Sequence, residues 1–173
     1  MKGTNFDPRT EILSALPALR AFAISLSGDL ERADDLVHDA VSSALSHLHQ
    51  FQPGTSMQAW LFTILRNHFH THFRKRRREV EDPDGAIAGR LYVNPEQHAH
   101  LDLQDLRAAL TKLPVKQREA LLLVTAHDMS YEEAARICDT AVGTIKSRVS
   151  RARLTLAHLI GAPPSTGDGD IIG

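Results

Sequence analysis

Short hydroxyl and basic side chains gather on one face of residues 142–159, and side chains of these types can bind DNA. At 100° per residue, Ile145, Val149 and Leu156 form one apolar stripe, which leaves the opposite face polar. Hydroxyls let a helix approach a groove closely, and cations reach phosphates and guanine edges. Because no Asp or Glu interrupts the segment, we expect DNA contact here and not merely a solvated face. The candidate residues are Thr144, Lys146, Ser147, Arg148, Ser150 and Arg151.

A helix-turn-helix would present that face to DNA. Ser130 and Glu133 have the spacing of a capping box, which fixes the start of a first helix. Asp139 tolerates the left-handed backbone of a tight turn, and Ala141 would begin the second helix without a capping oxygen. The spacing therefore predicts helix, turn and helix over residues 130–159, with the second helix in the major groove.

Charge is separated along the chain. The net charge of the 173 residues is −1, but Asp29 to Asp39 hold five acidic residues against one Arg. Residues 66–78 hold six Arg or Lys and no acid. We therefore expect opposed acidic and basic surfaces, of which the basic one suits a nucleic acid.

The rest of the composition limits the class of protein. Cys138 is the one cysteine, so an intrachain disulfide is excluded, and we expect this thiol in the core and not as a redox switch. The N-terminus has acids where a signal peptide needs an apolar run, and no stretch reaches a membrane-spanning length, which favours a soluble cytoplasmic protein that binds no membrane. No phosphate loop, nucleophile elbow or metal triad indicates an enzyme or a cofactor.

Apolar residues recur with helical spacing along the chain, so we expect an all-α fold. Asp7 and Pro8 suit the start of a first short helix, Pro17 suits a restart, and Gly28 suits the end of the second helix. A long helix then precedes a loop with Pro and Gly at residues 51–55, and another long helix ends in the Arg run.

Two small helical domains are expected, because the composition changes after the Arg run. The first domain would occupy residues 8–80, and a flexible acidic linker would follow over 81–94. The second domain would occupy residues 95–161, before a polar tail over 162–173 that we expect to be disordered.

These segments together resemble the extracytoplasmic-function (ECF) RNA polymerase sigma factors. Region 4 of such factors, which binds the promoter −35 element, is similar to LPVKQREALLLV, SYEEAARIC and VGTIKSRVSRAR. Region 2, which binds core polymerase and the −10 element, is similar to ERADDLVHDA, FQPGTSMQAWLFTILRN and FRKRRREVED. Three segments are especially similar to the EcfG type, which directs the general stress response of alphaproteobacteria. They are LRAFAISLSGD, FQPGTSMQAWLFTILRN and RKRRREVED. The resemblance implies a sigma region 2 bundle joined to a sigma region 4 helix-turn-helix, which together direct promoter-specific transcription initiation.

The resemblance also implies roles for the two charged patches. The acidic helix would dock on the clamp helices of core RNA polymerase through Asp34, Asp35, Val37, His38 and Asp39. Acids near a helix N-terminus also compensate its dipole, and both interpretations stay open. The loop at residues 51–57 would receive an unstacked −10 base, and the next helix would contact the strand backbone. The implied −10 residues are Gln52, Thr55, Ser56, Arg66, Asn67, His70, Arg74 and Lys75.

Some of these side chains have other interpretations. His68 and His72 share a helix face, as a metal-binding pair would, but residues 62–73 hold no carboxylate or Cys to complete a site. We therefore expect no metal, and packing or phosphate contact for these histidines. Trp60 can stack on a base, although its spacing favours the core.

Regulation by a partner is the last implication. Relatives of the EcfG type are held by a small helical anti-sigma factor, so the resemblance implies a NepR-like partner.

The core-binding helix departs from its relatives. Where relatives have Gln-Glu and then Arg-Ala-Trp in that helix, this chain has His38-Asp39 and Ser43-Ala44-Leu45. This departure leaves open a sigma-like decoy, or paralogue, that binds an anti-sigma factor without productive polymerase binding. A plain helix-turn-helix regulator is the other alternative, but it leaves residues 8–80 unexplained.

Overall fold

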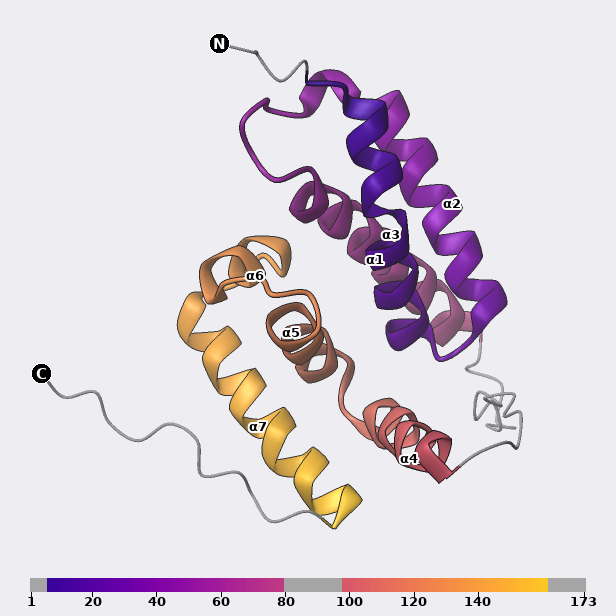
Figure 1. The fold of residues 1–173 in the computed structure, drawn as a ribbon, viewed down its shortest axis with the longest axis vertical. Coiled ribbons are helices and arrows are strands. Elements are labelled where there is room, and N and C mark those ends of the chain that lie inside the picture. The colour runs from indigo at the N-terminus through magenta and orange to yellow at the C-terminus, as the bar shows by residue number, and fades with distance from the viewer. Residues whose placement is uncertain (1–5, 80–97, 162–173) are drawn as a thin grey trace, which may run out of the picture.

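The computed structural model describes residues 6–79 and 98–161, and all regular elements in these two ranges are helices (Figure 1). The N-terminal half consists of α1 (Pro8–Ser27), α2 (Leu30–Ser46), a 3₁₀ turn (Leu48–Gln50) and α3 (Met57–Glu79). The C-terminal half consists of α4 (His98–Lys112), α5 (Val115–Thr125), α6 (Tyr131–Ile137) and α7 (Val142–Ile160). The all-α prediction is confirmed, and the predicted linker and tail lie outside the described residues.

Helix α1 is a single helix of 20 residues, so the predicted restart at Pro17 is wrong. The Asp7 side chain caps it by accepting a hydrogen bond from a backbone amide of the first turn (3.2 Å), and Gly28 ends it with a φ of 69°. Pro17 is exposed, and its ring costs the helix about 3 kcal/mol. Ile12 and Leu19, on either side of Pro17, are both buried in the core. Packing on both sides of the proline therefore keeps α1 continuous.

Helices α1, α2 and α3 pack on one another as a three-helix bundle. Phe22 of α1 and Phe62 of α3 are fully buried and meet edge to face, with ring centroids 4.9 Å apart. Burying an aromatic side chain of this size contributes about 1.5–3 kcal/mol. These two rings therefore fix how α1 and α3 lie against each other.

Helix α7 packs against α4, α5 and α6 in the C-terminal half. Its stripe of Ile145, Val149 and Ala152 is buried, as the helical spacing predicts. Leu123 of α5 and Leu113, just before α5, are also buried. This core is small, since α6 has only seven residues.

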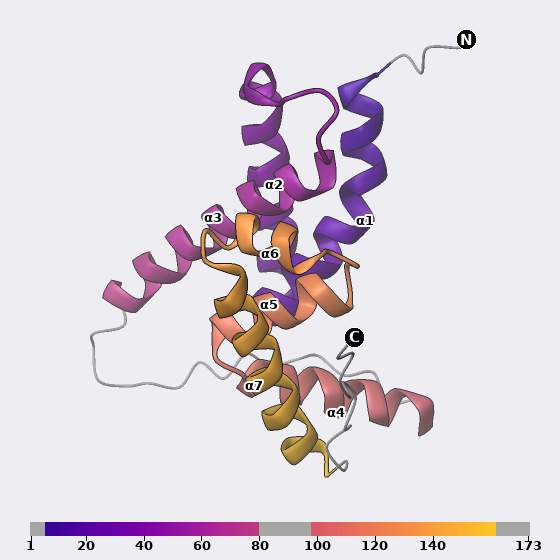
Figure 2. The same cartoon turned by 90° about the vertical axis from the view of Figure 1, so that its left-hand side faces the viewer.

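The two halves also pack directly on each other. Helix α3 contacts α6, and α1 contacts α4 and α5, so that α6 crosses in front of α3 in Figure 2. The buried residues of both halves form one continuous core. The surfaces that face each other across this domain interface are therefore not open to solvent.

Candidate functional site

The predicted helix-turn-helix is formed by α6, a turn and α7. The Ser130 hydroxyl accepts a hydrogen bond from the Glu133 amide (3.1 Å), and the Glu133 carboxylate accepts one from the Ser130 amide (2.9 Å). The capping box is therefore complete. Asp139 has a φ of 48°, the left-handed conformation that turns the chain, and Ala141 caps α7 without a side-chain hydrogen bond.

The polar face of α7 lies open beside its buried stripe. Its exposed predicted residues are Lys146, Ser147, Ser150 and Arg151. Thr144 and Arg148 are half-buried at the margins of this face. The Lys146 ammonium lies 5.7 Å from the centre of the Tyr131 ring, a cation–π distance that holds it beside α6. The face therefore presents the Ser147 and Ser150 hydroxyls together with the Arg151 cation at its centre, and groups of these types can contact phosphates and base edges.

The loop before α3 carries three predicted −10 residues, and all three are exposed. The Thr55 hydroxyl donates a hydrogen bond to the Gln52 carbonyl (2.7 Å). The Ser56 hydroxyl accepts one from the amide of the third α3 residue (3.1 Å) and so caps the helix. Trp60 is half-buried and packs on Phe51, with ring centroids 5.3 Å apart. These contacts give the loop a fixed shape, with Trp60 packed at the edge of the core.

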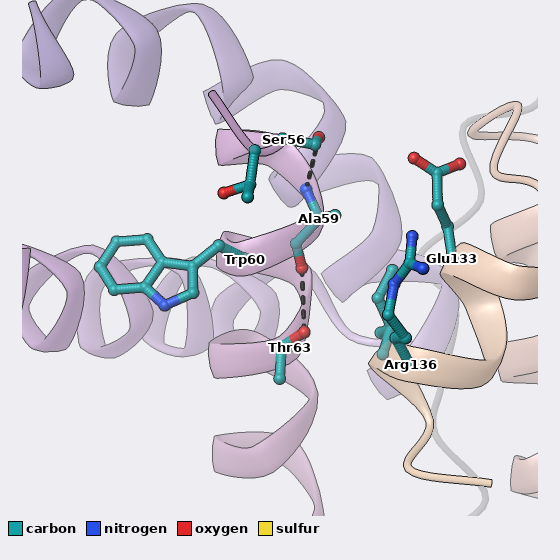
Figure 3. Close-up of a pocket in the computed structure, with 8 residues that line it drawn as sticks. Ser56, Ala59, Trp60, Thr63, Glu133 and Arg136 are labelled. Carbon is teal, nitrogen blue, oxygen red and sulfur yellow. Dashed lines mark hydrogen bonds between the residues drawn. The ribbon is translucent and has the colours of Figure 1, made fainter. Parts of the chain in front are cut away.

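A pocket of about 440 Å³ lies between this loop and the other half of the chain. Figure 3 shows Ser56 and Thr63 on the α3 side, opposite Glu133 and Arg136 of α6. The indole of Trp60 points away from Arg136 in the same view. Helix α6 thus closes one side of the space beside the first turns of α3.

Helix α3 divides the other predicted −10 residues into two groups. The exposed members are Asn67, Arg74 and Lys75. Arg66 and His70 turn toward α5 instead, where Arg66 Nε lies 3.3 Å from Glu119 Oε2 and His70 Nε2 contacts Glu119 Oε1 within hydrogen-bonding distance. Their side chains are only 13% and 17% exposed. The structure therefore places these two side chains in the domain interface, and their contact with DNA stays a prediction.

Two adjacent charged residues of α5 are buried in that interface. Glu119 is fully buried, which is rare for a carboxylate unless it is paired. The Arg118 guanidinium donates hydrogen bonds to the Leu26 carbonyl (2.9 Å) near the end of α1 and to the Leu113 carbonyl (3.3 Å). Burial lowers the pKa of Arg118, and the Glu119 carboxylate opposes that shift. A cation at the negative end of a helix is favourable, so Arg118 joins α5 to α1.

An imidazole fills the interface beside these charges. The His127 ring packs against Phe22 and Phe62 of the N-terminal half, with centroid distances of 5.5 Å and 4.8 Å. Burial lowers the pKa of His127, and the nearby Asp128 carboxylate opposes that shift. The closed arrangement therefore favours the neutral ring.

The predicted polymerase-binding residues lie on α2, on the side of the bundle away from α4–α7 (Figure 1). Asp34 is half-exposed and pairs with Arg20 of α1, with Oδ1 2.7 Å from Nε. Asp35 and His38 are exposed, and Val37 packs against the core. Asp39 is half-buried, and its Oδ2 lies 3.7 Å from an imidazole nitrogen of α3. Solvent screens an exposed ion pair such as this one, so Asp34 can exchange partners at little cost.

Cys138, at the C-terminal end of α6, is buried in the core, as the sequence predicts. Burial raises the pKa of the Cys138 thiol to about 11, and the Glu119 carboxylate adds to the shift. The thiol is therefore protonated at neutral pH, which leaves it a poor nucleophile.

Sequence patterns did not single out Arg118, Glu119 or His127. The available signal was an Arg-Glu pair beside the apolar run in LPVKQREALLLV, because charges are rarely placed in such a run without a buried partner. In the described residues, one group of three side chains has the arrangement of a metal site, and it joins His68 and His72 to Asp39. Its carboxylate comes from a different helix, which is why the spacing within α3 did not reveal it. No helix in the two described ranges combines the length and apolar character needed to cross a membrane.

Known proteins resemble this chain in both halves. The family model for Sigma-70 region 2 matches residues 12–79, and the model for Sigma-70, region 4 matches residues 103–156. The chain is 60% identical to the ECF RNA polymerase sigma factor EcfG of Rhodopseudomonas palustris (strain TIE-1), over 88% of this chain and 84% of that protein. It is 34% identical to the ECF RNA polymerase sigma factor SigC of Mycobacterium tuberculosis, over 75% of this chain and 71% of that protein.

Solved structures show the same likeness. The sigma factor RpoE of Bartonella quintana, in complex with the anti-sigma factor NepR, matches with a TM-score of 0.81 and 51% identity, over 88% of this chain and 96% of that one. The PhyRSL–NepR complex of Sphingomonas sp. Fr1 matches with a TM-score of 0.70 over 95% and 96% of the two chains, but at 17% identity it shows the fold alone. With both sigma-70 regions matched in order, and more than half of the residues shared with EcfG over most of both chains, this chain belongs to the ECF RNA polymerase sigma factors.

Proposed function

We propose that this chain directs RNA polymerase to the promoters of a general stress response, as a sigma factor of the EcfG type. The observation that carries the proposal is the 60% identity to EcfG across both halves, together with the open polar face of α7. Residues 8–80 would act as region 2 and residues 95–161 as region 4. The chain would work in the cytoplasm beside polymerase and DNA, without a cofactor and without catalysis of its own.

Each promoter element would meet a different surface. Helix α7 would read the −35 element through Thr144, Lys146, Ser147, Arg148, Ser150 and Arg151. The loop before α3 and that helix would bind the −10 element through Gln52, Thr55, Ser56, Arg66, Asn67, His70, Arg74 and Lys75. The clamp helices of core polymerase would meet α2 at Asp34, Asp35, Val37, His38 and Asp39. The exposure of most of these side chains supports the assignment.

The closed arrangement of the two halves would be a resting state. Arg66 and His70 cannot reach DNA while Glu119 holds them, and α6 narrows the space along α3. Promoter binding would therefore require the domain interface to open. The binding of polymerase to the open form would supply the free energy that is needed to open the interface.

An anti-sigma factor would hold the chain away from polymerase. The similar RpoE structure is a complex with NepR, which supports a NepR-like partner for this chain. A partner that binds the closed form better than the open form would shift the equilibrium away from polymerase binding. We therefore expect polymerase and this partner to compete.

Binding of labelled chain to purified core polymerase tests the proposal. We expect the wild-type chain to bind, Asp35→Lys to bind much more weakly, and the control Glu11→Lys, which changes an exposed acid of α1, to bind normally. A NepR-like protein added in increasing amounts should displace the polymerase. Failure of the wild-type chain to bind core polymerase, with binding to the anti-sigma factor retained, would support the decoy alternative instead.

A further inference from the structure

Two histidines and an aspartate meet on the N-terminal bundle, away from the domain interface. Asp39 of α2 and His68 and His72 of α3 each place one possible ligand atom within 4.8 Å of the others. Asp39 Oδ2 lies 3.7 Å from His72 Nε2. The two imidazole rings stand nearly perpendicular, with centroids 6.4 Å apart. We call these three residues the Asp39 cluster.

The packing of α2 on α3 holds the Asp39 cluster together. His68 and His72 are four residues apart, so both lie on one face of α3. Ala40 and Phe69, which follow Asp39 and His68 in the chain, are buried in the bundle core. The backbone positions of these two ligand residues are thus fixed by the core, while the side chains of Asp39 and His72 are about half exposed, at 42% and 50%. The side chains can therefore rotate toward a common centre without unfolding the bundle.

We propose that the Asp39 cluster binds a late first-row divalent transition metal ion, with Zn²⁺ as the simplest occupant. Two imidazole nitrogens and one carboxylate oxygen form a donor set that zinc takes in three-ligand sites, where water or another donor fills the fourth position. Tetrahedral bonds of about 2.1 Å need donor atoms roughly 3.4 Å apart, so donor atoms that lie up to 4.8 Å apart must approach one another by up to about 1.4 Å. Mg²⁺ and Ca²⁺ prefer oxygen donors and fit this set poorly.

Other histidines of the bundle serve as an internal comparison. His47 and His49 also lie close together, with ring centroids 6.3 Å apart. In the described part of the chain no carboxylate joins them to make a group of three. His70 lies on α3 between the two ligands, but its side chain is engaged by Glu119. The carboxylate of α2 is therefore what distinguishes His68 and His72.

A bound ion would have two physical effects on the bundle. It would link α2 to α3 and stabilise the folded chain, because the unfolded chain has no preformed site. It would also compensate the charge of Asp39, one of the residues we assign to polymerase contact. The metal proposal itself does not depend on that assignment, since it needs only the geometry of the bundle.

Titration of the full-length, metal-free chain with ZnCl₂ tests the proposal. We expect calorimetry to show one Zn²⁺ site per chain, and the melting temperature to rise with added Zn²⁺. Asp39→Asn and His68→Ala should each weaken Zn²⁺ binding by at least about tenfold. The double variant His47→Ala/His49→Ala should bind Zn²⁺ like the wild-type chain.

Circular dichroism of the metal-free variants separates loss of a ligand from loss of the fold. Absorption bands of bound Co²⁺ in the wild-type chain give a second measurement that needs no variant, since a tetrahedral site of nitrogen and oxygen donors absorbs strongly in the visible. The proposal would be overturned if the wild-type chain failed to bind Zn²⁺ below about 1 mM. Equal Zn²⁺ affinity in folded Asp39→Asn, folded His68→Ala and the wild-type chain would overturn it as well.

Discussion

Glu119 of α5 couples the two halves of the chain through side chains of α3. Its carboxylate is fully buried and contacts Arg66 and His70 of α3. A charge that loses its partner in a buried site is strongly destabilising, by about 3–5 kcal/mol. Two side chains assigned to DNA are thereby held by one carboxylate, so a change at this residue acts on the whole interface.

Replacing Glu119 by Gln should loosen the closed arrangement. The amide keeps the size of the side chain but removes the charge that pairs with Arg66, so we expect the interface to lose about 1.5–3 kcal/mol. Small-angle X-ray scattering should then show a larger radius of gyration than for the wild-type chain. Glu132→Gln, which changes an exposed acid of α6, is the matched control. Identical scattering from Glu119→Gln and wild type would contradict this role for Glu119.

Arg151 belongs to the centre of the proposed −35 face. Because it is exposed, Arg151→Ala should leave the fold intact and weaken binding to a cognate −35 sequence by about 1–3 kcal/mol. The matched variant Arg153→Ala removes an exposed arginine nearer the apolar stripe, and should weaken binding to cognate and scrambled DNA equally. Fluorescence anisotropy with both DNA sequences gives the comparison. If Arg151→Ala bound cognate DNA as the wild-type chain does, Arg151 would not be part of the reading face.

At the scale of elements, the sequence predicts helix ends that depend on neighbouring residues. It does not predict the features that depend on packing between distant segments. The capping box of Ser130 and Glu133 and the stop at Gly28 depend on residues close in sequence, and all occur where expected. Pro17 was misinterpreted because its local cost was weighed without the tertiary packing of α1. The partners of Arg66 and His70 lie 53 and 49 residues away, so no helical period contains them. The open face of α7 was predictable, because it follows from periodicity alone.

The N-cap residue of helix α7 has no side chain that can accept a hydrogen bond, so the stability of this helix can be tested by adding one. Ala141 has the extended backbone of an N-cap, but no side-chain hydrogen bond. Ala141→Ser supplies an acceptor for the free amides of the first turn, so the free energy of unfolding should rise by about 0.5–2 kcal/mol. Urea denaturation of Ala141→Ser and of the wild-type chain, whose alanine supplies no acceptor, gives the comparison. Equal stability of Ala141→Ser and the wild-type chain would show that the amides of α7 need no cap here.

At the scale of the whole molecule, closure depends on a few polar side chains set in an apolar contact. Arg118 binds carbonyls at the end of α1, and His127 fills the space between Phe22 and Phe62. Interfaces between domains of one chain open readily unless they are large and apolar. Small energetic changes should therefore move the equilibrium between closed and open forms.

Acidification should open the two halves through His127. Burial in the closed form lowers the pKa of this imidazole from its ordinary value of 6.5, with Asp128 opposing, whereas separation of the halves returns the ring to solvent. The open form then binds more protons below pH 6.5, so closure is stable above this pH and weakens as the pH falls toward the lowered pKa. Energy transfer between dyes on the two halves should therefore decrease on acidification. His127→Gln should show a smaller decrease, and an unchanged pH profile in that variant would assign the effect to other groups.

Run-off transcription tests the central claim, that this sigma factor directs promoter-specific initiation. Purified core polymerase and the full-length chain are combined on a template with a GGAAC-type promoter, and a single round of synthesis is measured. The account predicts a transcript of defined length that needs the chain, disappears when the −35 sequence is scrambled, and falls about 5- to 150-fold with Arg151→Ala, the equivalent of 1–3 kcal/mol. A folded chain that yields no transcript above core polymerase alone, or equal transcript from the scrambled template, would contradict it.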